Sequence, residues 1–83
     1  MDRAQTICRM HQRLLINVKS QIFKMLEDGH SADSAYDMSS TALSMLLADY
    51  IKVYVKEDKY HEVLDKISSE ALAIAIEAKA AKG

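Results

Sequence analysis

Hydrophobic side chains in the first third of this chain recur at the three- and four-residue spacing of an α-helix. The recurrence stops at Asp28-Gly29, and glycine at such a place can adopt the left-handed conformation that ends many helices. The pattern therefore predicts a first helix over residues 2–27. Its apolar stripe comprises Cys8, His11, Leu15, Val18, Ile22 and Met25, widened by Ile7, Leu14 and Leu26.

A second helix is expected over residues 33–55, because side chains that cap helix N-termini precede the next apolar segment. These candidate caps are Ser31, Asp33 and Ser34. Residues 51–55 also alternate apolar and polar side chains of strand-forming types, which leaves a short strand as an alternative.

The apolar pattern changes phase after Tyr54 and resumes on a rotated face at Tyr60. Such a change favours a turn near residues 56–59 and a third helix over residues 58–81, with Asp58 as its N-cap. The chain has no proline and one internal glycine, so long helices meet no obligatory break. We expect an all-α fold, a three-helix antiparallel hairpin or bundle formed as a single helical domain over residues 1–83.

The second helix carries more apolar surface than one short chain is expected to cover. On a helix its apolar side chains span an arc of about 180°, whereas a surface helix needs little more than about 100°. A chain of 83 residues also buries only about 60–65% of its unfolded surface. We therefore expect a homodimer or higher oligomer. Its predicted interface residues are Leu43, Leu46, Leu47, Tyr50, Ile51 and Tyr54.

Three pairs of apolar residues lie away from the main stripes of their helices. They are Ile16 and Phe23, Met38 and Met45, and Leu72 and Ile76. Displaced pairs of this kind suggest further contact surfaces, and methionine adapts to irregular partners. The sequence thus favours a non-enzymatic regulator, adaptor or inhibitor that engages a larger protein.

Charge is unevenly distributed, although the formal net charge is only -1. Residues 1–26 hold five Lys or Arg and one Asp, whereas residues 27–83 hold six Lys and eleven Asp or Glu. A basic first helix can contact phosphates, so a dimeric nucleic-acid-binding regulator is the alternative function. Its contact residues are Arg3, Arg9, Arg13 and Lys24. A solvated polar face explains the same residues.

Candidate catalytic chemistry is incomplete. Cys8 and His11 stand three apart on one helix, but the orienting group and oxyanion site that a nucleophile needs are missing. An acidic cluster with one histidine surrounds Asp58-Lys-Tyr-His61, whereas helical di-iron sites repeat Glu-x-x-His on two helices. We expect no enzyme activity, no cofactor and no metal site.

Cysteine usage and hydropathy bear on location. One cysteine cannot form an internal disulfide, which fits a reducing cytoplasm. The longest uncharged apolar run, Met38 to Ala48, covers 11 residues against the ~20 that span a bilayer. Arginines near the N-terminus interrupt any signal-peptide core. A cytoplasmic protein without a membrane partner is expected.

Overall fold

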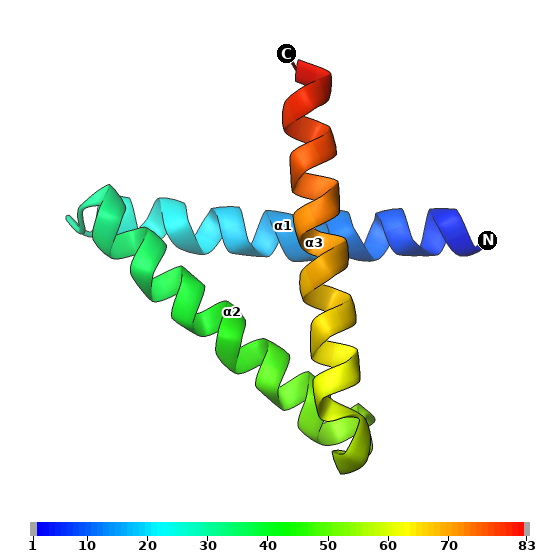
Figure 1. Cartoon of the computed structure of the whole chain (residues 1–83). Helices are drawn as coiled ribbons and strands as arrows, with labels where there is room; N and C mark the ends of the chain where they lie inside the picture. The colour runs from blue at the N-terminus through cyan, green and yellow to red at the C-terminus, as the bar shows by residue number, and fades with distance from the viewer. Residues whose placement is uncertain (1, 83) are drawn as a thin grey trace. The chain divides into compact units, whose positions relative to one another are not determined.

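The computed structural model describes residues 2–82, and these fold into three α-helices joined by short connections (Figure 1). Helix α1 spans Arg3–Glu27, α2 spans Ala32–Tyr54 and α3 spans Tyr60–Lys82, with a 3₁₀ turn η1 at Glu57–Lys59. The described residues contain no strand. The all-α prediction is confirmed, and each predicted helix end lies within two residues of the observed one.

Helix α1 begins with a capping box. The Asp2 carboxylate accepts a hydrogen bond from the Gln5 backbone N–H at 2.8 Å, and the Asp2 backbone N–H donates to Gln5 Oε1 at 3.3 Å. The Thr6 hydroxyl adds a bond to the Asp2 carbonyl at 3.0 Å. Backbone groups that a helix start leaves unpaired are thereby satisfied locally.

Helix α1 ends in a Schellman motif, as its glycine predicted. Gly29 has φ 97°, in the left-handed region. Its N–H donates to the Leu26 carbonyl at 3.2 Å, and the His30 N–H donates to the Met25 carbonyl at 3.1 Å. These two bonds close the helix and turn the chain toward α2.

Ser31 is the side chain that starts helix α2. Its hydroxyl oxygen accepts from the Ser34 N–H at 3.1 Å, and its carbonyl accepts from the Ala35 N–H at 2.9 Å. At the other end the Val55 N–H donates to the Ile51 carbonyl at 3.0 Å. Ile51 through Tyr54 are helical, so the strand alternative for this segment is wrong.

The break between α2 and α3 falls at Lys56, which has extended backbone angles, φ -71° and ψ 145°. The Lys59 N–H then donates to the Lys56 carbonyl at 2.8 Å, which closes the 3₁₀ turn. The predicted turn at residues 56–59 is confirmed. Asp58 as N-cap of the third helix is wrong, because Asp58 lies inside η1 and the backbone changes direction two residues earlier.

The chain divides into two compact units, Met1–Ser44 and Met45–Gly83, with the division inside α2. Among the residues whose burial is described, 2–81, Ala35 is the buried residue of the first unit, at 0% exposure, and Ile51 that of the second, at 9%. Each unit also has half-buried side chains. In the first unit they are Val18, Ile22, Met25, Ser34 and Ser39; in the second they are Leu47, Val55, Tyr60, Val63 and Ile67.

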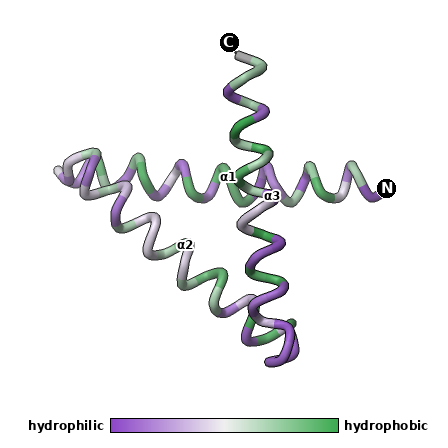
Figure 2. The backbone as a smooth tube through the Cα atoms, viewed as in Figure 1, coloured by the Kyte–Doolittle hydropathy of each residue, from purple (hydrophilic) through white to green (hydrophobic). Residues whose placement is uncertain are grey.

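Burial therefore follows the predicted stripes but is shallow. Val18, Ile22 and Met25 are the centre of the α1 stripe, and Tyr60, Val63 and Ile67 are the N-terminal half of the α3 stripe. Many other large apolar side chains stay exposed in both units. Figure 2 shows these hydrophobic positions interspersed with polar ones along each helix.

We predict that Gly29→Ala destabilises the fold by about 1 kcal/mol, because an L-residue is strained in the left-handed region. A methyl group there meets nothing within 4 Å, so the effect is conformational and not steric. Gly29→Asn is the matched control and loses less, since asparagine tolerates positive φ. Thermal unfolding followed by circular dichroism measures both. Equal losses for Ala and Asn contradict this account.

Candidate functional site: an exposed apolar face of helix α2

The two buried residues of α2 lie on different sides of that helix. At about 100° per residue, Ala35 and Ile51 are separated by about 160° around its axis. Ser39 is half-buried on the Ala35 side, and Leu47 is half-buried on the Ile51 side. Burial on α2 thus occurs at two separate positions of its apolar arc, Ala35 and Ile51.

The middle of that arc is uncovered in the described residues. Tyr54 is 76% exposed and Leu46 is 56% exposed, and Leu43 and Tyr50 are both 49% exposed. The rings of Tyr50 and Tyr54 contact each other in a tilted arrangement, with centroids 5.5 Å apart. We call these four residues, Leu43, Leu46, Tyr50 and Tyr54, the α2 apolar face.

Tyr36 extends this face by about two turns and was not among the predicted interface residues. It is exposed, and it shares a helix side with Leu43 because the two are seven residues apart. The sequence does carry a signal for Tyr36, because a seven-residue repeat links it to Leu43 and Tyr50.

The α2 apolar face carries no charged side chain. The charged residues of the helix are Asp33, Asp37, Asp49 and Lys52, and by helical position all lie outside it. Its polar atoms are tyrosine hydroxyls, which suit surfaces that are apolar at the centre and wet at the rim.

Two predicted interface residues are covered by their own chain. Ile51 is buried, and Leu47 is half-buried. Both lie at the edge of the arc next to the α2–α3 connection, where the half-buried Val55 and Tyr60 follow in the chain. They lie beside the α2 apolar face and add little exposed area to it.

The displaced apolar pairs are also exposed. Ile16, Phe23, Met45, Leu72 and Ile76 each keep at least 60% of their surface, and Met38 keeps 38%. Met38 and Met45 lie on the side of α2 opposite its apolar face. These pairs remain separate surfaces.

The basic residues of α1 are partly gathered. Arg9 and Arg13 line a shallow depression along one side of the helix, together with Thr6, Met10 and Leu14. Arg3 and Lys24 do not line it. The depression thus brings two of the four predicted phosphate-contacting residues together beside apolar side chains.

The other candidate chemistry is dispersed over the surface. Cys8 is exposed, and so is His11. In the acidic cluster, Lys59 Nζ pairs with Glu62 Oε2 at 3.3 Å. Within residues 2–82 no group of three or more His, Cys, Asp or Glu is placed to hold a metal ion. No helix in that range is long and apolar enough to cross a membrane.

Comparisons with protein-family models, with curated proteins and with solved structures found no match to this chain.

We predict that Ile51→Ala lowers the free energy of unfolding by about 2 kcal/mol, the lower end of the range for removing a buried Ile side chain. Met45→Ala is the matched control on the same helix. Met45 is 63% exposed, so its loss stays within about 0.5 kcal/mol. Urea unfolding followed by circular dichroism compares the two. Equal effects contradict the assignment of Ile51 to the interior.

Proposed function

We propose that this chain is a non-enzymatic helical binding protein that pairs with itself through the α2 apolar face. As a pair it engages a larger protein as a regulator, adaptor or inhibitor. The supporting observation is that Leu43, Leu46, Tyr50 and Tyr54 stay exposed between the two edges of α2 that their own units cover.

Exposure of this kind favours an interface. Contiguous apolar patches on soluble proteins commonly mark contact sites. Interface cores are enriched in aromatic residues and depleted of charge, which matches the composition of the α2 apolar face. Tyrosine also loses little conformational entropy on binding because its side chain has few rotatable bonds.

A second copy is the partner that this face fits most simply. A two-fold contact brings the same patch of each chain together, so a charge near the two-fold axis meets an identical charge. The α2 apolar face contains no charged residue, and self-pairing therefore costs no like-charge repulsion. Pairing of two such faces buries Tyr50 and Leu46 of both copies.

Engagement of a larger protein is supported by the methionines on the opposite side of the same helix. Met38 and Met45 remain exposed when the α2 apolar face is covered, because they lie about 125–145° around the axis from its centre. Flexible thioether side chains fit irregular apolar surfaces.

We predict that Tyr50→Glu abolishes self-association, because a carboxylate at the centre of a paired apolar face is buried without a partner charge, at a cost of several kcal/mol. Tyr50 is half-exposed in the single chain, so the helix stays folded. Sedimentation equilibrium at tens of micromolar and circular dichroism measure association and folding separately.

Met45→Glu is the control for that experiment. It adds the same charge on the opposite side of α2, so self-association remains and only binding to the larger partner weakens. A well-folded wild-type monomer at tens of micromolar overturns the proposed pairing.

Nucleic-acid binding is the second candidate, supported by the placement of Arg9 and Arg13 on one side of α1.

We predict that replacing Arg9, Arg13 and Lys24 by glutamine leaves folding and binding to the larger protein nearly unchanged, since exposed substitutions stay within about 0.5 kcal/mol each. Titration with duplex DNA and with RNA at two salt concentrations is the measurement. If the wild type binds nucleic acid in a salt-sensitive way and the triple variant does not bind, the nucleic-acid function is favoured, because phosphate contacts release counterions.

A further inference from the structure

Helices α1 and α3 each carry a second stripe of exposed side chains, and the two stripes have the same spacing. The α1 outer stripe is Arg9, Arg13, Ile16, Ser20 and Phe23, and the α3 outer stripe is Asp65, Ser69, Leu72, Ile76 and Lys79. In both, the steps along the chain are four, three, four and three residues. This is the heptad spacing that keeps side chains on one helix side facing a parallel partner.

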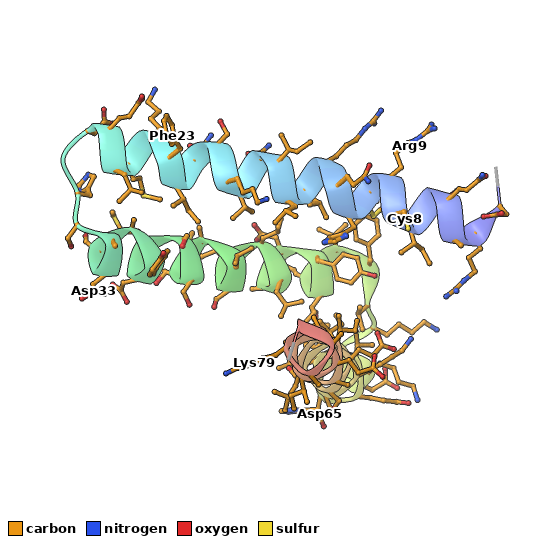
Figure 3. The ribbon with its side chains drawn as sticks, turned by 90° about the horizontal axis from the view of Figure 1, so that it is seen from above. Cys8, Arg9, Phe23, Asp33, Asp65 and Lys79 are labelled. Carbon is orange, nitrogen blue, oxygen red and sulfur yellow. The ribbon has the colours of Figure 1, made fainter. Side chains whose placement is uncertain are left out.

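All ten side chains are exposed. Figure 3 shows Arg9 and Phe23 projecting from the same side of α1, and it shows Asp65 and Lys79 leaving α3 in neighbouring directions. Each outer stripe lies well over 100° around its helix from the half-buried stripe. The half-buried residues there are Val18, Ile22 and Met25 on α1, and Tyr60, Val63 and Ile67 on α3.

The two outer stripes complement each other in charge and order. Each begins with a charged residue and continues into apolar side chains, and the first charges, Arg9 and Asp65, are opposite. In a parallel alignment that pairs Arg9 with Asp65, Ile16 meets Leu72 seven residues further on. Phe23 then meets Lys79, a pair suited to a cation–π contact.

Other alignments are less favourable. An antiparallel arrangement of the same stripes places Arg9 against Lys79, which are both cationic. Parallel pairing of α1 with α1 places Arg9 against Arg9, and parallel pairing of α3 with α3 places Asp65 against Asp65. Like charges in direct contact discriminate against such partners. The ion pairs within α3 and η1 join Lys59 to Glu62 and Lys66 to Glu70, so neither uses Asp65 or Lys79.

The occupant of each stripe is a second copy. All ten side chains are exposed in the single chain, so neither stripe is covered by its own chain. Every copy carries one α1 outer stripe and one α3 outer stripe. A contact between unlike surfaces of identical chains can propagate from copy to copy.

We propose that the α1 outer stripe of one copy binds the α3 outer stripe of another in parallel, and that this contact links α2-paired dimers into larger assemblies. The contact covers 15 residues, about 21 Å of helix. That is two heptads, fewer than the three or four that mark an independent coiled coil. The linkage therefore rests on the proposed α2 pairing, because each paired dimer carries two α1 outer stripes and two α3 outer stripes, which can bind together.

Charge reversal tests the contact by sedimentation velocity over a concentration series. Arg9→Glu alone and Asp65→Arg alone each weaken association of dimers by about fivefold, as expected when an exposed ion pair becomes a repulsive pair. An equimolar mixture of the two variants restores assembly, because the reversed α1 stripe of one meets the reversed α3 stripe of the other. Arg3→Glu and Glu77→Arg are the controls: each makes the same charge change about 120° around the same helix from the stripe, and each leaves assembly unchanged.

Contrary outcomes separate the two proposals. A wild-type chain that stops at the dimer overturns this contact and leaves α2 pairing intact, whereas a wild-type monomer overturns both. Single variants that weaken assembly no more than their controls overturn the contact. The mixture can also fail to restore assembly while a single chain with both substitutions does restore it. That result places the ion pair within one chain and overturns the contact between copies.

Discussion

The apolar circumference of α2 is the constraint on which the rest of this molecule depends. The helix buries Ala35 and Ile51, whereas the other members of the same apolar arc that stay exposed in the described residues are Leu43, Leu46, Tyr50 and Tyr54. Burial of apolar surface is the main favourable term in folding and in association. A helix that offers more apolar surface than its neighbours remove from water thus carries a driving force for association.

The same constraint explains the shallow interior of each unit. One fully buried alanine contributes little hydrophobic free energy, and one isoleucine contributes about 1.5–3 kcal/mol. Local hydrogen bonds instead define much of the structure, because they set the ends of the helices. The capping box at Asp2, the Schellman motif at Gly29 and the Ser31 cap fix where helices begin and end, independently of the packing between them.

Helix boundaries were predictable because they depend on neighbours in sequence. Gly29 identified the end of α1, and the phase change after Tyr54 identified the break before α3. The detail at that break was not predictable. Asp58 is a good capping residue, but the backbone turn occurs at Lys56. The Lys56 side chain makes no capping hydrogen bond, so side-chain capping does not set the position of this turn.

The candidate site was predictable as a side of a helix but not as a set of available residues. Periodicity placed Leu47 and Ile51 beside Leu43 and Tyr50 on one arc. Which of them is exposed is not fixed by periodicity, because Ile51 is buried near the α2–α3 connection while Tyr50, one residue earlier, is exposed. Tyr36 was missed because Asp37 separates it from the uncharged run that begins at Met38, although its spacing from Leu43 is regular.

The tyrosines of α2 also give the molecule a built-in optical reporter. The chain has four tyrosines and no tryptophan, so tyrosine emission is not masked by energy transfer to an indole. Tyr36, Tyr50 and Tyr54 lie on one side of α2, and the fourth, Tyr60, is half-buried beyond the connection to α3. Most of the ultraviolet fluorescence of this protein thus originates at a single surface, and its intensity and accessibility to a soluble quencher follow whatever covers that surface.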